Sequence, residues 1–357
     1  MSLLERAGKI EADARRASRA NDFVDLARRI ALARGDYLQA LTTADSERAP
    51  MDVRAVLKAA AAAGAVAVGS WGEPISLYDG LVRAFADSLR NFGAFDRLLP
   101  SMRSVPLRSR CAIVSAGAFG SVVAEGAPTP ISELSFVDAQ VAENKAICVL
   151  VLTLELARLS GPQANSLFGR ELRRALTATV DTKFLELITD SISPISSSGG
   201  FSTNVIADVD SALQAVNTDA ASELFILAHP AVAKGWSTRV TADGTIAFPQ
   251  MSPKSGQIVG IETVVSDGVP AGTFVLVDAN QLAAASTTIE LDASTQSSLQ
   301  FSTTPDSPID ATSVMQSLWQ ENKIALRALR FFGAKRLRDT AVAVVDGAIY
   351  SDDSPPA

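Results

Sequence analysis

From Arg108 to about Glu155 the sequence alternates with a period of two, which is typical of β-strands. Residues 125–130 (EGAPTP) interrupt this pattern with Gly and Pro, so the segment predicts two long strands joined by a turn. The half of this hairpin nearest the turn has few bulky side chains, and an isolated hairpin is only marginally stable in water. We therefore expect the hairpin to be stabilised by packing on another surface.

A long helix is predicted over residues 160–189, directly after the hairpin. Ser160 and Pro162 are typical of a helix start. Its apolar positions recur at helical spacing, and at 1.5 Å per residue the helix would be roughly 40 Å long. The predicted stripe consists of Phe168, Leu172, Leu176, Val180, Phe184 and Ile188.

The rest of the chain predicts a compact α/β unit followed by further strands. Within residues 204–284 we expect helices at 205–216 and 230–238 and strands at 224–228, 257–265 and 273–278. Beyond this unit the pattern indicates short strands near 288–291 and 299–302. A long strand at 315–330 and a last one at 341–345 complete the chain. The sequence contains no repeat of 20–50 residues.

The N-terminal region differs from the remainder in charge. Residues 1–50 have a helical pattern, and residues 1–34 contain eight Lys or Arg and five Asp or Glu, a net of +3. The whole chain carries −7, so the other residues carry about −10. A basic helical arm on an acidic body and a solvated helix face both fit this asymmetry. Residues 59–72 are low in complexity and predict a linker, and a helix is expected over 76–91.

Composition excludes several classes of protein. One His and two Cys are too few for a local Cys/His zinc site or a disulfide-rich secreted scaffold, and we expect neither a metal nor a cofactor. No apolar run reaches the roughly 20 residues of a membrane-spanning helix, and the N-terminus lacks a signal-peptide layout. We expect a protein that folds in a reducing cytoplasm without membrane contact.

Residues that could support catalysis have simpler structural interpretations. His229 would be the only histidine base, and no G-x-S-x-G motif accompanies it, so a structural histidine is favoured. Cys111 and Cys148 in the two hairpin strands are interpreted as buried, inert thiols. Asp181, Lys183 and Glu186 on the long helix fit either ion pairs between subunits or a solvated helix face.

The order of these parts resembles the major capsid proteins of tailed phages with the Hong Kong 97 fold, an α+β fold. The resemblance covers about residues 75–350. It is carried by residues 122–130 (VVAEGAPTP) and 134–136 (LSF) in the hairpin, and by 154–156 (LEL) before the helix. Residues 181–185 (DTKFL) in the helix and 322–331 (NKIALRALRF) near the C-terminus complete the pattern.

The resemblance implies a name for each part. Residues 1–50 would be an N-terminal helical arm and 51–108 a linker and N-arm. Residues 109–156 would form the extended loop that lies over a neighbouring subunit, and 204–284 the axial domain. Residues 157–203 and 285–357 would form the peripheral domain, with the spine helix at 160–189.

The resemblance also implies a function. The chain would assemble as pentamers and hexamers into an icosahedral shell around double-stranded DNA, located in the virion and assembled in the bacterial cytoplasm. Its partners would be other copies, a portal, a scaffold or maturation protease, and a cementing protein, with weak contact to DNA. Some relatives join subunits through a lysine in the loop, but no lysine occurs between Lys58 and Lys145. We therefore expect a non-covalent, non-enzymatic shell whose N-terminal arm is retained.

Three groups of residues are the predicted contact sites. The extended loop would contact a neighbour, the spine helix would carry charged contacts, and the arm would touch DNA or the inner shell. The loop residues are Phe119, Val122, Glu125, Pro128, Pro130, Leu134 and Phe136; the helix residues are Arg173, Arg174, Asp181 and Lys183; the arm residues are Arg15, Arg16, Arg19, Arg28 and Arg29.

Two other classes of function remain open from the sequence. An encapsulin-like compartment would share the fold and enclose a cargo enzyme in place of a genome. An α/β hydrolase would have to use His229. A fibrous tail protein is disfavoured, because the chain has no repeats.

Overall fold

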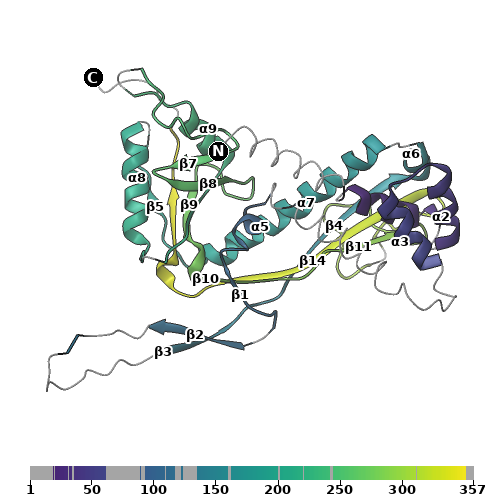
Figure 1. Ribbon diagram of the computed structural model, residues 1–357, viewed down its shortest axis with the longest axis horizontal. Helices are drawn as coiled ribbons and strands as arrows, with labels where there is room; N and C mark the ends of the chain where they lie inside the picture. Colours follow the sequence, from purple (N-terminus) through teal and green to yellow (C-terminus); the bar gives the residue numbers. More distant parts are fainter. Residues whose placement is uncertain are drawn as a thin grey trace. The chain divides into compact units, whose positions relative to one another are not determined.

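The computed structural model describes residues 19, 21–30, 32–33, 36–61, 89, 93–108, 110–116, 122–123, 135–159, 162–199, 202–219, 221–241, 244–310 and 312–350. Helices and mostly antiparallel sheets make up these residues, so the predicted α+β class is confirmed (Figure 1). No helix in the described ranges has both the length and the hydropathy needed to cross a bilayer.

The chain divides into two compact units. The first draws on Met1–Phe92, Ala146–Thr177 and Thr288–Arg330. The second draws on Gly93–Lys145, Ala178–Thr287 and Phe331–Ala357. Helix α7 and strand β14 contribute residues to both units.

The first unit opens with helices. Residues 21–30 are helical, and α2 (Tyr37–Ser46) and α3 (Met51–Ala61) follow. Asp36 caps α2 by accepting from the backbone N–H of Leu38 at 2.9 Å. Apolar side chains at helical spacing are buried on these helices: Phe23, Val24, Leu26, Val53, Val56 and Leu57.

Helix α3 corrects the first residues of the linker predicted over 59–72. Val53, Val56 and Leu57 form an apolar stripe that the low-complexity residues after it obscured, and residues 59–61 complete this helix. Residues 62–72 of the predicted linker and, apart from Leu89, the predicted helix at 76–91 lie outside the described residues. Helix α5 (Ala94–Leu98) is a short helix that the sequence pattern did not indicate.

The predicted long helix is α7 (Pro162–Thr189), preceded by the short α6 (Leu154–Leu159). Its predicted apolar stripe is buried from Phe168 to Ile188. In the second unit Phe184 of this stripe packs edge-to-face on Phe95 of α5, with ring centroids 5.2 Å apart.

A five-stranded sheet has the order β1-β10-β14-β11, and β4 also pairs with β14. Its long strand, β14, extends the predicted strand at 315–330 at one end and shortens it at the other. The chain turns just before β14, where Asn322 has a φ of 52°, a left-handed conformation that Asn tolerates. The strands are β1 (Arg103–Ser104), β4 (Asn144–Thr153), β10 (Leu282–Ser286), β11 (Glu290–Ser294) and β14 (Lys323–Arg336).

The predicted hairpin is only partly correct. Strands β2 (Arg110–Ala116) and β3 (Ser135–Gln140) form an antiparallel pair, but β4 leaves this pair and joins β14. The change of partner occurs at residues 141–143, where the side chain of Val141 is buried. Alternating apolar residues run through both β3 and β4, so the sequence pattern could not show that the strand changes partner.

The second unit contains a six-stranded sheet with the order β5-β15-β9-β6-β8-β7. Helices α8 (Ser202–Ala215) and α9 (Pro230–Ser237) occur where the sequence predicted helices. The strands are β5 (Ile195–Ser196), β6 (Leu224–Ala228), β7 (Ser255–Ile258), β8 (Ile261–Val265), β9 (Phe274–Asp278) and β15 (Val342–Asp346). Short 3-10 turns, η1 (Ala279–Gln281) and η2 (Asp339–Ala341), precede β10 and β15.

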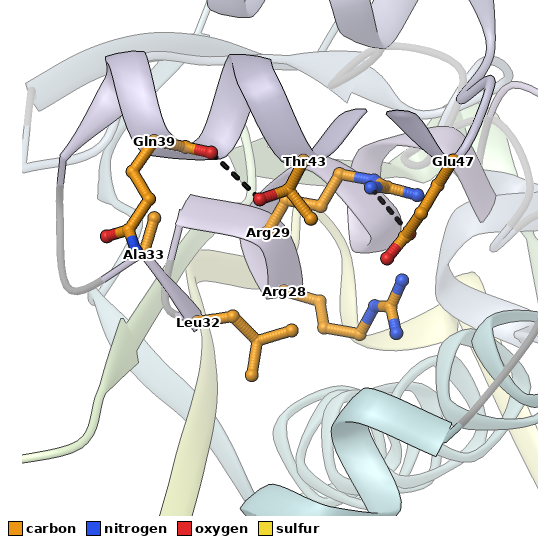
Figure 2. Close-up of a pocket in the computed structure, with 7 residues that line it drawn as sticks. All are labelled: Arg28, Arg29, Leu32, Ala33, Gln39, Thr43 and Glu47. Atoms are coloured by element: carbon orange, nitrogen blue, oxygen red, sulfur yellow. Dashed lines mark hydrogen bonds and ion pairs between the residues drawn. The ribbon is translucent and has the colours of Figure 1, made fainter. Parts of the chain in front are cut away.

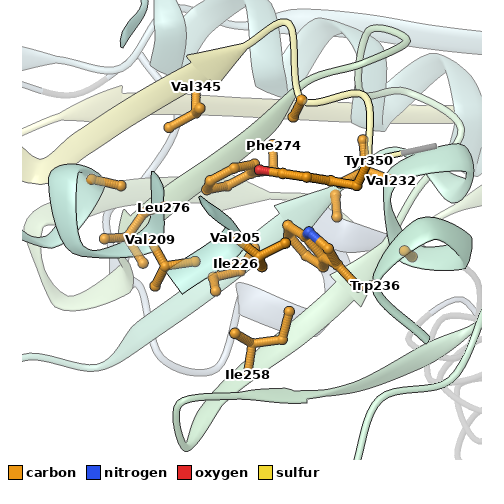
Figure 3. Close-up of a cluster of buried hydrophobic side chains, with 14 of the residues drawn as sticks. Val205, Val209, Ile226, Val232, Trp236, Ile258, Phe274, Leu276, Val345 and Tyr350 are labelled. Atoms are coloured by element: carbon orange, nitrogen blue, oxygen red, sulfur yellow. The ribbon is translucent and has the colours of Figure 1, made fainter. Parts of the chain in front are cut away.

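The core of this sheet is built around Trp236 (Figure 3). Its ring packs edge-to-face on Phe274 at a centroid distance of 5.2 Å. The ring of Tyr350 lies beside Trp236 in the same cluster, with centroids 6.1 Å apart, and its hydroxyl donates to Asp208 at 2.7 Å. The residues just after β15, Ala348 and Tyr350, therefore belong to the buried core around Trp236.

Two details of this sheet differ from the prediction. The single strand expected at 257–265 is two strands, because Val259 and Gly260 both have positive φ and form a tight turn between β7 and β8. The last strand, assigned to the peripheral domain with residues 285–357, is β15, and it pairs with β9 and β5. Its side chains Ala343 and Val345 belong to the core around Trp236.

Two very short strands complete the described elements. Strands β12 (Ser298–Leu299) and β13 (Gln316–Ser317) pair with each other. Most of the described residues between them are exposed. We name residues 297–322 the acidic lobe, because their charged side chains, Asp306, Asp310 and Glu321, are all acidic.

Candidate assembly surfaces

The β2–β3 hairpin holds the first predicted group of contact residues. Its register places Val114 opposite Phe136, with an irregularity between Val114 and Ala116. Val122 is fully exposed, as expected for a residue near the end of a hairpin. The described part of the chain gives β2 and β3 no strand partner other than each other. The other predicted loop residues, Phe119, Glu125, Pro128, Pro130 and Leu134, lie outside the described residues.

The root of the hairpin is held on the five-stranded sheet. Val141 packs with Val105, Ala283 and Ala285 in a small buried cluster. A side chain at position 333 would overlap the carbonyl oxygen of Ala142 and lie 2.6 Å from Cγ1 of Val141, so only Gly allows this approach. The hairpin is therefore anchored at its base.

Asp181 on α7 was predicted to be a surface charge, and this prediction is wrong. Its side chain is 1% exposed and accepts backbone N–H bonds from Ala94 at 2.8 Å and Phe95 at 3.1 Å. Ser266 donates its hydroxyl to the same carboxylate at 2.6 Å. Burial raises the pKa of Asp181 to about 6, although these hydrogen bonds act in the opposite direction. Asp181 therefore connects α7, α5 and the turn after β8.

The other predicted residues of α7 divide into exposed and buried groups. Lys183 pairs with Glu186 at 2.7 Å on the exposed face, which matches the solvated interpretation. Arg174 is exposed as well. Arg173 is 5% exposed and donates to Asn21 at 3.3 Å, so it is part of the interior of the first unit. Burial lowers the pKa of Arg173.

The predicted basic arm does not present all its cations to the surface. Arg19 is exposed and lies 3.8 Å from Asp52. Arg28 and Arg29 are buried, and both pair with Asp25, at 3.0 and 2.7 Å. Arg15 and Arg16 lie outside the described residues.

A small cavity of about 260 Å³ lies between the helix of residues 21–30 and α2 (Figure 2). Arg29 bonds to Glu47 at 2.9 Å along its wall, and the lining also includes Leu32, Gln39 and Thr43. The carboxylates of Asp25 and Glu47 balance the two arginines, so Arg28 and Arg29 are poorly placed to contact DNA.

The residues considered for catalysis have structural roles. His229 is the N-cap of α9, and its Nδ1 accepts from the N–H of Ala231 at 3.1 Å. A catalytic triad requires the opposite arrangement, in which Nδ1–H donates to a carboxylate. Cys148 is half-buried, and burial raises its pKa, as an inert thiol requires. In the described ranges, no group of three or more His, Cys, Asp or Glu could hold a metal.

Exposed apolar side chains form a candidate surface that the sequence reasoning missed. Large hydrophobic residues on the acidic lobe are between 43% and 72% exposed: Phe301, Ile309, Val314, Met315 and Trp319. A short run of Ser, Thr, Pro and Asp looks like an ordinary loop, and only the structure shows how far these apolar side chains are exposed. One of them, Phe301, has Lys323 over its ring, with Nζ 4.3 Å from the centroid.

Comparison with known proteins gives a match from a phage capsid. The chain is 30% identical over 320 residues to the "Capsid polyprotein" of Pseudomonas phage PAJU2, which is 82% of this chain. The chain spans about half the length of this curated relative, 48%. The resemblance to phage capsid proteins predicted from the sequence is therefore confirmed.

Solved structures provide more distant neighbours. A chain from Gordonia phage Cozz aligns with a TM-score of 0.48 and 14% identity, over 71% of this chain and 86% of that chain. A chain from "Capsid of empty GTA particle computed with C5 symmetry" aligns with a TM-score of 0.45 and 11% identity, over 71% and 90%. No family model matches the chain.

Proposed function

We propose that the chain is the major capsid protein of a tailed phage or a phage-derived particle. In this proposal it has the Hong Kong 97 fold and assembles as pentamers and hexamers into an icosahedral shell around double-stranded DNA. The observation that carries the proposal is the 30% identity to a phage capsid polyprotein over 82% of the chain. The role is structural and not enzymatic, which fits the capping role of His229.

The described architecture supports this proposal in two ways. The β2–β3 hairpin has no further strand partner in the described part of the chain, and a neighbouring copy would provide the packing surface that such a ribbon needs. The acidic lobe exposes five large apolar side chains, and such exposure is typical of a surface that a partner covers.

The proposal assigns a role to each segment. The hairpin within residues 109–156 serves as the extended loop, and α7 as the spine helix of the peripheral domain. Residues 204–284 serve as the axial domain, and β15 completes its sheet. The remaining partners follow from the same proposal: a portal, a scaffold or maturation protease, a cementing protein, and packaged DNA in weak contact. The protein would assemble in the host cytoplasm and reside in the virion.

Expression of the full chain followed by electron microscopy tests the proposal. We expect uniform closed shells, or particles of that kind when the chain is isolated from phage. Nucleic acid extracted from native particles would support a viral shell, whereas a protein cargo without DNA would identify an encapsulin-like compartment. A chain that stays monomeric across salt and concentration would contradict the proposal.

A further inference from the structure

The acidic lobe combines exposed apolar side chains with unbalanced negative charge. No Lys, Arg or His occurs between Lys254 and Lys323, a segment that includes the whole lobe. Asp306 and Asp310 accept hydrogen bonds from neutral donors, Ser313 and Thr312. Neither carboxylate has an ion pair within the described residues. The lobe therefore presents apolar surface and uncompensated anions together.

A complementary surface exists in the second unit. Arg103 of β1 and Lys335 of β14 both lie directly opposite Ala283 of β10, so the three residues share one face of the sheet. With a strand spacing of about 4.8 Å, the Cα atoms of Arg103 and Lys335 are roughly 10 Å apart. We name this pair of residues the basic row.

The basic row is available for a partner. Both side chains are exposed, and in the part of the chain that the structure describes neither forms an ion pair. This contrasts with other exposed cations, such as Arg327, which pairs with Asp292 at 2.5 Å. Leu107 and Leu337 are only partly buried beside the same small cluster, so apolar surface adjoins the two cations.

We propose that the acidic lobe of one copy docks on the basic row of a second copy. This inference rests on the proposed shell function, which brings many copies together. The two surfaces differ, so the contact is head-to-tail, and contacts of that kind form closed rings when the rotation between successive copies closes. Trp319 and Val314 would pack near Leu107 and Leu337, while Asp306 and Asp310 would face Arg103 and Lys335. Charge complementarity would orient the copies and speed their association.

Charge reversal on each surface tests the proposal. Asp306→Lys with Asp310→Asn reverses the lobe, and Asn at 310 keeps the acceptor that closes the local turn. Arg103→Glu with Lys335→Glu reverses the row. Reversing either surface alone should lower the yield of particles by about tenfold or more, and combining both should restore most of it. Sedimentation and negative-stain microscopy measure the yield, and circular dichroism checks folding.

A matched control separates the contact from a general effect of charge. Asp210→Lys with Asp219→Asn makes the same charge change on exposed residues, and Asp219 also accepts a backbone N–H, from Ala221. This control should assemble like the wild type. Loss of assembly in the control as well, or normal shells from the lobe-reversed protein, would overturn the proposal.

Cross-linking gives a second measurement. Copies with Val314→Cys and copies with Lys335→Cys are mixed before assembly and then oxidised. A disulfide-linked dimer that forms only in the mixture supports the contact, and its absence from intact shells contradicts it. A wild-type chain that forms no particles refutes the proposed function and this inference together. If the wild-type chain forms shells but the mixed Val314→Cys and Lys335→Cys copies form no disulfide, this inference alone is refuted.

Discussion

Two charged side chains of helix α7, Asp181 and Arg173, are buried in the folded protein. Asp181 and Arg173 have the sequence appearance of a solvated helix face, yet both are buried by packing against segments distant in sequence. The first N–H groups of a helix have no acceptor within the helix, and Asp181 accepts those of α5. A carboxylate suits this position because the N-terminus of a helix carries partial positive charge. The cost of burying it appears as its raised pKa.

The raised pKa of Asp181 predicts a pH dependence of stability. Its pKa rises from 3.8 to about 6 on folding, so the folded state binds more protons between these values. Stability should therefore fall as pH rises from about 4 to 6 and level off above, by roughly 3 kcal/mol in total. Urea unfolding of unassembled subunits at several pH values measures it.

Asp181→Asn is the comparison for this prediction, because it removes the titrating group. Asp22 also has a pKa raised to about 6, so only the difference between wild type and variant isolates Asp181. The difference in free energy of unfolding between wild type and Asp181→Asn should change between pH 4 and pH 6. A constant difference from pH 4 to pH 7 would show that Asp181 does not titrate there.

The cap at His229 predicts a small effect at one residue. His229→Ala removes the acceptor for the N–H of Ala231 and should lower stability by about 1 kcal/mol. His229→Asn, which keeps a capping acceptor, should be close to wild type. Shell formation should be unchanged in both. Thermal unfolding and microscopy measure these outcomes, and loss of assembly in the Asn variant would point to another role for the ring.

At the scale of elements, the junction between β3 and β4 decides how the hairpin is held. The alternating apolar pattern is continuous through β3 and β4, but β3 pairs with β2 whereas β4 pairs with β14. The change requires residues 141–143 to cross closely over β14 at Gly333. A single small residue thus sets where the hairpin departs from the sheet.

Gly333→Ala tests this junction. Its Cβ would overlap the Ala142 carbonyl, which belongs to the backbone and cannot rotate away, so the hairpin root must shift. We expect a loss of about 2 kcal/mol or more. Gly235→Ala in α9 is the matched control, because its Cβ would meet Tyr350 at an ordinary 3.5 Å and Ala favours helix by about 1 kcal/mol. Urea unfolding measures the stability of both variants. Equal stability of Gly333→Ala and Gly235→Ala would show that the hairpin root does not need Gly at position 333.

At the scale of the whole molecule, the absence of lysine between Lys58 and Lys145 concerns the assembled shell. Without a lysine in the hairpin, the loop has no amine to form an isopeptide bond with a neighbour. We expect mature particles boiled in denaturant to run as a single band at the mass of one chain. A ladder of higher multiples would refute a non-covalent shell.

Much of the fold follows from local pattern. The stripe of α7, the Pro at its start, and the helices and strands of residues 202–278 were predictable because burial on one face imposes a period of 3.6 or 2. The capsid resemblance also came from the order of these parts. The hairpin was expected for the same reason, although its length was overestimated.

Tertiary structure alone decided which charges are inside and which strands are partners. Asp181 looks like a surface residue, and its burial depends on backbone N–H groups that the distant helix α5 brings to it. Arg28 and Arg29 are buried as well; both pair with Asp25 one turn away on their own helix, and Arg29 also reaches the more distant Glu47. The pairing of β15 with β9 and of β4 with β14 likewise joins segments far apart in the chain. Periodicity reports which face of an element is buried, whereas its partner depends on packing that no local window contains.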